Sequence, residues 1–263
     1  MNMLSRLGII GIICGLSLGS LTAQEREEDK GLSPAARFSN MSEEDRTTYG
    51  KFFVDAQSFY RQKRIFECMQ AIAEASAIFK HDARLWNLEG SCYVQIRNFT
   101  KAKASFQKAV ELSPKQPSLL FNMAEMDFVS KDWSAALEAF DGFLKFITDN
   151  YSDEQIKVNP NVNELYRLGV FKKVLVLLEL ERLGEAKPLA QSLWDTWDDT
   201  PFTYYSKAAF HYKNDREDEG KEEVLKAFRV FGGLAGVSTW HDTMIEIGYV
   251  ESFYGNEEDE EDE

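Results

Sequence analysis

Large and small side chains recur at helical spacing between Trp86 and Pro114, on both sides of a short polar turn. Gly90 lies one helical turn after Trp86 and Tyr93 follows three residues later, so these residues share one helix face. Beyond the turn, a second helix face carries Ala102, Phe106 and Ala109. Pro114 ends this second helix, because proline lacks an N–H and disfavours helix in the preceding residue. The pattern predicts a helical hairpin that is closest where Gly90 opposes Ala102.

A hairpin of this size cannot bury its own apolar faces, so internal repeats are expected. A step of 34 residues aligns four sets of large or small residues: Phe52, Trp86 and Leu120; Ala56, Gly90 and Ala124; Cys68, Ala102 and Ala136; Ile72, Phe106 and Phe140. These sets define hairpins at 49–82, 83–116 and 117–150. After an insertion at 151–166, the pattern resumes at 167–200 and 201–234. The last segment, 234–254, is expected to be a helix that shields the final repeat.

This pattern resembles the tetratricopeptide repeat, whose 34 residues carry Trp, Leu-Gly, Tyr, Ala, Phe and Pro at fixed positions. Residues 83–116 match at Trp86, Gly90, Tyr93, Ala102, Phe106, Ala109 and Pro114, although Glu89 stands where the family has Leu. The other repeats match mainly by residue size. The resemblance implies an all-α, tetratricopeptide-like superhelix of helical hairpins over residues 42–254, with about five repeats and a terminal capping helix.

The resemblance also implies a concave groove, lined by the first helix of each repeat, that holds a peptide or a partner helix. Carried over by position, the groove residues are Phe53, Gln57, Tyr60, Arg84, Asn87, Ser91, Phe121, Glu125, Phe128, Phe171, Tyr205 and Tyr212. This mixture of aromatic and polar residues suits an apolar peptide with a few hydrogen bonds. The alternative is that the aromatic residues pack between helices or against the terminal helix. A related subclass of the family holds the carboxylate end of a peptide with a Lys/Asn clamp in this groove. The matching positions here, Phe53, Gln57, Asn87 and Ser91, include no lysine, so we do not expect a clamp of that type.

The two ends of the chain differ in composition from the repeats. Residues 1–23 carry a positive charge at Arg6 followed by a short apolar run, which is typical of a secretory signal peptide. The mature protein is then expected to be exported: periplasmic in a Gram-negative bacterium, otherwise secreted. Residues 24–41 are charged and read as a flexible leader. Residues 255–263 include seven consecutive acidic residues from Glu257, a run typical of a solvated, disordered tail.

The charge and the motifs of the sequence reduce the number of functions that are expected. The net charge of −14 argues against a nucleic-acid partner. Cys68 and Cys92 lie on apolar helix faces and are expected to be buried free thiols. The three histidines are far apart, which predicts no metal site. No GxSxG, phosphate loop or HExxH motif is present, so we expect no catalytic residue, no cofactor and no enzymatic activity.

The sequence therefore favours an exported scaffold or adaptor that binds a protein or peptide, without a stable membrane span in the mature chain. Two alternatives remain. A structural subunit could stack its repeats into an envelope assembly, or an aromatic groove could hold a carbohydrate or another small ligand.

Overall fold

The computed structural model describes residues 31–194 and 200–251, and the expected signal segment 1–23 and acidic tail 255–263 lie outside this part. Within it, every regular element is a helix, which confirms the all-α expectation. The helices are α1 (Pro34–Ser39), α2 (Glu43–Arg61), α3 (Ile65–Ile78), α4 (Ala83–Gln95), α5 (Phe99–Leu112), α6 (Pro117–Val129), α7 (Trp133–Asn150), α8 (Asp153–Val158), α9 (Pro160–Glu179), α10 (Leu183–Gln191), α11 (Phe202–Lys213), α12 (Glu217–Val230) and α13 (Leu234–Ile247).

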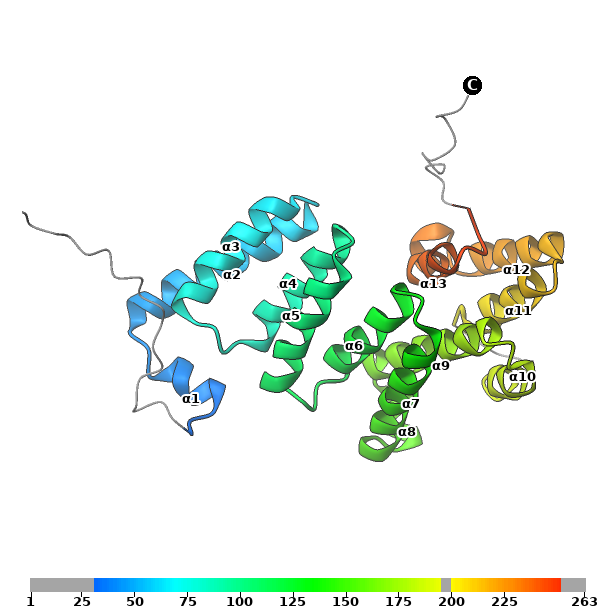
Figure 1. Ribbon diagram of the computed structural model, residues 1–263, viewed down its shortest axis with the longest axis horizontal. Coiled ribbons are helices and arrows are strands. Elements are labelled where there is room, and N and C mark those ends of the chain that lie inside the picture. Colours follow the sequence, from blue (N-terminus) through cyan, green and yellow to red (C-terminus); the bar gives the residue numbers. More distant parts are fainter. Residues whose placement is uncertain (1–30, 195–199, 252–263) are drawn as a thin grey trace, which may run out of the picture.

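Five antiparallel pairs follow one another along the molecule: α2–α3, α4–α5, α6–α7, α9–α10 and α11–α12 (Figure 1). Each pair turns through one non-glycine residue with positive φ, namely Lys63, Arg97, Lys131, Glu181 and Asp215. Because this left-handed conformation is uncommon outside glycine, its recurrence at the same place in each turn marks a common register. Several helix starts are capped by a side chain; for example, the Ser42 hydroxyl accepts the Asp45 N–H at 3.0 Å before α2.

The buried hydrophobic residues that the structure describes form two main clusters and a small one. One main cluster joins α2, α3 and α4, and a larger one runs from Ala102 on α5 to Ile247 on α13. The small cluster contains Ala83, Ala109 and Leu119. Helix α9 is apolar nearly all round, with the run Val174–Leu178 buried. Such a helix must be enclosed by neighbours, and α9 packs against α6, α7, α8, α10 and α11.

The segment 151–166, which was expected as an insertion, forms α8 and the start of α9. A second difference concerns residues 24–41, expected to be a flexible leader. In the described part of that range, α1 forms behind the Ser33 cap and Pro34. The Phe38 ring lies 5.7 Å from the Tyr49 ring and 5.2 Å from the Phe79 ring. This aromatic contact holds α1 on the first hairpin, which corrects the expectation of a flexible leader.

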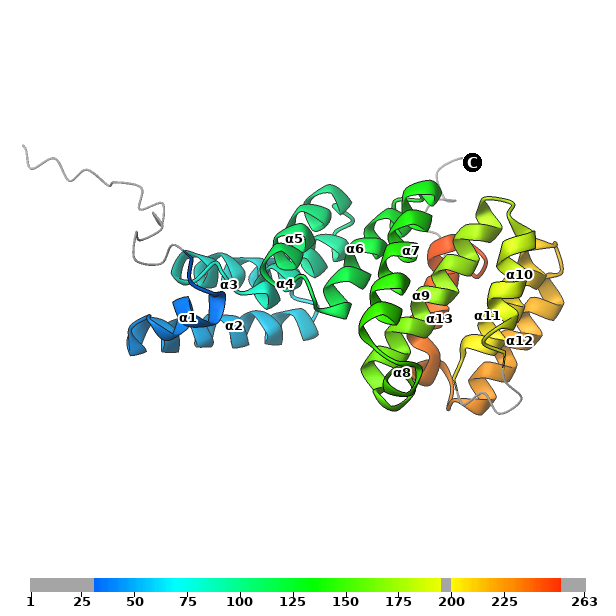
Figure 2. The same ribbon diagram turned by 90° about the horizontal axis from the view of Figure 1, so that it is seen from below.

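The terminal helix α13 returns along the array and lies beside α9 and α11 (Figures 1 and 2). Its Trp240 ring is 5.4 Å from the Phe171 ring of α9 and 6.4 Å from the Tyr205 ring of α11. His241 contacts Phe228 of α12, with ring centroids 5.3 Å apart. The helix therefore shields the last hairpin, as expected, and also covers part of the hairpin before it.

Cys68 on α3 and Cys92 on α4 meet in the core between the first two hairpins. Both are buried free thiols with their sulfur atoms 3.2 Å apart, well beyond a disulfide bond length. Hydrogen bonding to Cys68 and burial raise the pKa of the Cys92 thiol, which disfavours the reactive thiolate.

We expect two free thiols when a chain that begins after residue 23 is denatured without reductant. A thiol assay with Ellman's reagent measures this number, and the Cys92→Ala variant, expected to give one, calibrates it. A count of zero in the unsubstituted chain would show that the two sulfurs are joined.

Candidate protein-interaction surface

The first helices of the hairpins, α2, α4, α6, α9 and α11, present one side of the array, which we call the first-helix face. Its open part lies on α2, α4 and α6. Gln57 and Arg84 are exposed there, and the half-buried members are Tyr60, Asn87, Ser91 and Glu125. Burial raises the pKa of the Tyr60 hydroxyl, while hydrogen bonding with Ser91 and Gln95 opposes that shift.

Several predicted groove aromatics are instead part of the core, which corrects those assignments. Phe121 turns between α6 and α7, where its ring is 5.5 Å from the Phe143 ring. Phe128 is 1% exposed and sits 5.7 Å from the Trp133 ring. Large aromatic rings at these positions gain more from burial inside the hairpin than from exposure on its face.

Four further predicted residues, Phe171, Tyr205, Tyr212 and Phe53, are covered at least in part by other side chains of the protein. Phe171 and Tyr205 are fully buried beneath Trp240 of α13. Tyr212 is half-buried, and its ring stacks 6.0 Å from the ring of Tyr249, which follows α13. On α2, Phe53 is 8% exposed because the Arg84 guanidinium lies 4.9 Å above its ring. The first-helix face of the last two hairpins is therefore occupied by α13 and the residues after it.

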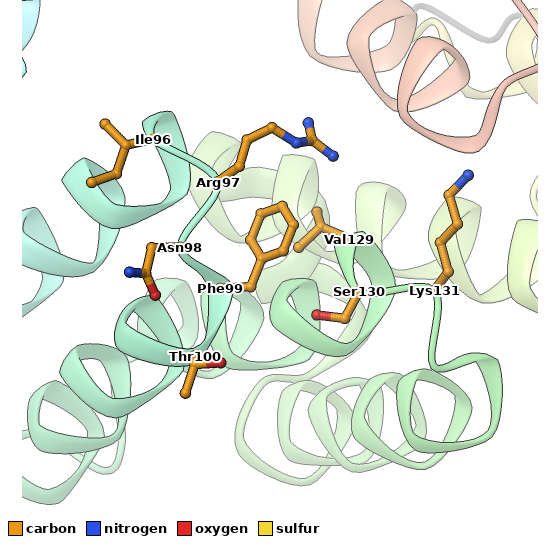
Figure 3. A pocket seen from close by; sticks show the side chains of 8 residues that line it. All are labelled: Ile96, Arg97, Asn98, Phe99, Thr100, Val129, Ser130 and Lys131. Atoms are coloured by element: carbon orange, nitrogen blue, oxygen red, sulfur yellow. The ribbon is translucent and has the colours of Figure 1, made fainter.

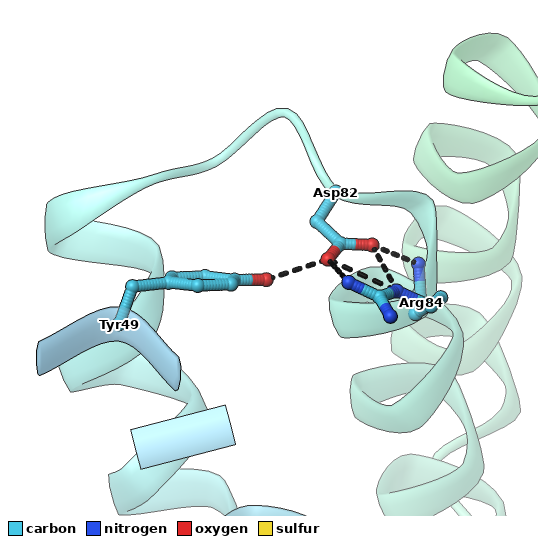
Figure 4. Close-up of polar contacts among 3 residues, drawn as sticks. All are labelled: Tyr49, Asp82 and Arg84. Carbon is cyan, nitrogen blue, oxygen red and sulfur yellow. Dashed lines mark hydrogen bonds and ion pairs between the residues drawn. The ribbon is translucent and has the colours of Figure 1, made fainter. Parts of the chain in front are cut away.

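Arg84 is fixed by a polar contact between the first two hairpins (Figure 4). Asp82, the N-cap of α4, accepts the Tyr49 hydroxyl at 2.8 Å and the Arg84 Nη2 at 2.6 Å. Burial alone would raise the pKa of Asp82, but hydrogen bonds from Arg84 and Tyr49 outweigh it and hold this pKa below its ordinary value. The charged carboxylate thus orders the start of α4 and the position of Arg84 on the open face.

We expect Asp82→Asn to reduce the free energy of unfolding by about 1 kcal/mol at pH 7, because the charge-assisted bonds weaken. The lowered pKa means that this contribution is complete above the ordinary Asp pKa of about 3.9 and is lost as pH falls through the folded-state value. Urea unfolding of both proteins at pH 7 and at about pH 3 tests this. A stability difference that stays constant between the two pH values would contradict it.

A polar strip crosses the open face between neighbouring first helices. Asn122 Nδ2 donates to Asn87 Oδ1 over 2.8 Å, which joins α6 to α4. Glu125 forms an ion pair with Lys172 of α9, whose side chain is only 4% exposed. The Lys172 ammonium also lies 4.2 Å from the Phe128 ring centroid. Asn122 and Lys172 were missing from the sequence-derived set, although a lysine inside the apolar run of α9 was a usable signal.

An open cleft of about 660 Å³ lies at the hairpin tips, between the α4–α5 and α6–α7 turns. Its apolar wall includes Ile96 and Phe99, and Figure 3 shows Arg97 and Lys131 extending from the two turns. Arg97 reaches Glu246 of α13 at 4.0 Å, and its side chain is 73% exposed. An exposed pair at this distance contributes little, so Arg97 is available to a ligand.

The arrangement offers a binding surface built from hydrogen-bonding groups and exposed cations. Among the residues that the structure describes, no group of three or more His, Cys, Asp or Glu could hold a metal ion. None of the helices described is both long and apolar enough to cross a bilayer.

Comparison with known proteins agrees with this architecture. Residues 83–116 match the family model described as "Tetratricopeptide repeat". Type IV pilus assembly protein PilF of Pseudomonas aeruginosa strain PAO1 is 29% identical over 88 residues, a match that covers 33% of this chain and 35% of that protein. The chain thus matches about a third of this curated relative.

Two solved structures share the fold. The structure described as "Functional Characterization of Pseudomonas Aeruginosa pilF" aligns with a TM-score of 0.52 and 12% identity, covering 78% of this chain and 91% of that one. The crystal structure of MamA protein aligns with a TM-score of 0.50 and 14% identity, covering 72% and 94%. The match to a tetratricopeptide repeat and the similarity to a pilus assembly protein agree with the expectation of an interaction scaffold rather than an enzyme. The chain therefore contains a stretch, residues 83–116, that is similar to a tetratricopeptide repeat, within an all-helical fold of stacked hairpins.

Proposed function

We propose that the open first-helix face of α2, α4 and α6 binds a peptide or a helix of a partner protein. The position of helix α13 is the observation that supports this proposal. This helix lies on the same face of the last two hairpins, where Trp240 contacts Phe171 and Tyr205. The first-helix face thus accommodates a helix of this chain, and its remaining part presents Gln57, Arg84 and the polar strip.

The open part differs chemically from the part beneath α13. Phe171 and Tyr205 are both completely buried, whereas Gln57 and Arg84 are exposed and Ser91 is half-buried. A partner segment on the open part therefore meets amide, hydroxyl and guanidinium groups around the half-covered Phe53 ring. Such a surface suits a segment with one apolar anchor and several hydrogen-bonding or acidic side chains.

Capture of partners from a cell-envelope extract tests the proposal when the bait is compared with two variants of equal charge. Gln57→Arg with Ser91→Arg fills the open face. Gln70→Arg with Gln107→Arg adds the same charge to exposed positions of α3 and α5. We expect the first variant to lose at least tenfold of the captured partner and the second to retain it. Equal capture by both variants would place the binding surface elsewhere.

We further propose that the protein is exported to the cell envelope and contributes to an envelope assembly. The signal-like segment 1–23 supports export, and the similarity to a type IV pilus assembly protein supports the envelope. In a lipid-anchored alternative, Cys14 would carry the lipid, but Ile13 precedes it where a small residue is usual. Cell fractionation of the full chain and of a chain that begins at residue 24 tests export. Recovery of both in the same compartment would contradict it.

A further inference from the structure

A pocket of about 400 Å³ lies between α10 and α11, away from the open first-helix face. Three of its lining residues are cations: Lys187 on α10, Lys207 on α11 and Arg216 before α12. Among the residues that the structure describes, no carboxylate lines the pocket, and none of these three cations forms an ion pair. In a chain whose net charge is −14, three converging cations without acidic partners are a distinct feature.

Aromatic side chains form the apolar wall of this pocket. The Trp194 indole is held by a hydrogen bond from its Nε1 to Ser206 Oγ at 2.7 Å, and the Lys207 ammonium lies 5.4 Å from its ring centroid. Phe210 meets the same indole edge to face at 6.4 Å. His211 also lines the pocket, and its Nδ1 is buried without a hydrogen-bond partner among the described residues. The aromatic wall is thus held in place, while the His211 Nδ1 has no hydrogen-bond partner among the described residues.

The pocket between α5 and α6 has lining residues at equivalent positions. Counted from the positive-φ turn residues, Lys103 corresponds to Lys187, and Asp127 corresponds to His211. In the α5–α6 pocket, Lys103 Nζ binds Asp127 Oδ1 at 2.6 Å. Asp132 lines that pocket at the position that Arg216 takes in the other.

The two acidic residues of the α5–α6 pocket thus correspond to a histidine and an arginine in the α10–α11 pocket. The lysine is retained in both pockets, but only in the first does the chain supply its carboxylate. Within the described residues, the α10–α11 pocket lacks the anion that its counterpart has, and a carboxylate from outside this set would complete the same contact.

We propose that this pocket binds carboxylates of the acidic run Glu257–Glu263 of the same chain. The described chain passes the end of α11 eight residues before the run begins: the Tyr249 ring stacks 6.0 Å from the Tyr212 ring, and Tyr249 Oη donates to Glu179 Oε1 at 2.8 Å. From residue 251, six extended residues reach about 20 Å before the first glutamate of the run, which exceeds the ~10 Å width of a helix. The run thus has the charge and the reach to enter the pocket.

A peptide with the sequence of residues 257–263 tests the proposal by titration calorimetry at low salt, against a chain that ends at Asn256. We expect this shortened chain to bind the peptide. The intact chain should bind it at least about tenfold more weakly, because its own run competes at high effective concentration. Lys187→Met with Lys207→Met and Arg216→Met in the shortened chain should also weaken binding about tenfold or more.

The matched control is Lys51→Met with Lys115→Met and Lys157→Met, which removes the same charge from exposed positions elsewhere. It should change the peptide affinity less than about twofold. Arg216→Gln alone, at an exposed residue, leaves the aromatic wall of the pocket unaltered and should also weaken peptide binding to the shortened chain.

Three results would overturn the proposal. The shortened chain does not bind the peptide, the control loses as much affinity as the pocket variant, or the intact chain binds added peptide as strongly as the shortened one. Asp195, Asp198 and Asp199 follow Trp194 in the sequence and lie outside the described residues. If they supplied the carboxylates instead, the first of these results would be obtained.

Discussion

Trp240→Ala should reduce the free energy of unfolding by about 3–5 kcal/mol, the usual cost of removing a large buried aromatic side chain. Trp240 is 5% exposed, and its ring contacts the rings of Phe171, Phe202 and Tyr205. The truncation leaves a cavity where α13 meets α9 and α11. Chemical unfolding of the variant measures the loss.

The same substitution should release α13 locally, because Trp240 is its main aromatic contact with the first-helix face. Amide hydrogen exchange should rise in α13 and in the adjoining part of α11, with little change in α2 and α3. Ser238→Ala, at an exposed position of α13, should alter neither stability nor exchange. A loss below about 1 kcal/mol for Trp240→Ala would show that α13 does not depend on this contact.

Gly90→Leu should destabilise the protein by about 3 kcal/mol, at the upper end of the usual cost of overpacking. A Cβ at Gly90 would lie 2.6 Å from the Phe106 ring, a distance that forces the ring or the helices to move. Phe106 is itself 2% exposed and has little room to turn. Thermal or urea unfolding measures the effect.

Gly142→Ala on α7 provides a control of opposite sign. An added Cβ there meets no atom within 4 Å, so the helix gains the propensity of alanine, roughly 0.5–1 kcal/mol. If Gly90→Leu left the stability unchanged while Gly142→Ala increased it, the close contact between α4 and α5 at Gly90 would be contradicted.

The hairpin arrangement could be predicted because it depends on local spacing. Small residues at one-turn intervals place helices in close contact, and this property is visible in the sequence. The detail at Gly90 was less accurate: the Phe106 ring, rather than Ala102, comes closest to it. The pattern identifies the face that a side chain occupies, but not how far a large ring extends.

The candidate surface was harder to predict because its limits depend on contacts between distant residues. Tyr205 occupies a family groove position, yet Trp240 covers it. Phe121 occupies another, yet its ring turns inward to Phe140 and Phe143. A position carried over from a family therefore indicates the helix face, while exposure depends on side-chain size and on the path of the rest of the chain.

Site-specific photo-crosslinking tests most directly the claim that the open first-helix face binds a partner while α13 occupies the rest. A photoreactive amino acid is placed at Gln57 or Ser91 on the open face, at Gln70 or Gln107 on the second helices, or at the exposed Asp242 on α13. We predict one common partner protein crosslinked from Gln57 and from Ser91, and none from Gln70, Gln107 or Asp242. Crosslinks to that partner from Gln70, Gln107 or Asp242, with none from the open face, would contradict the account.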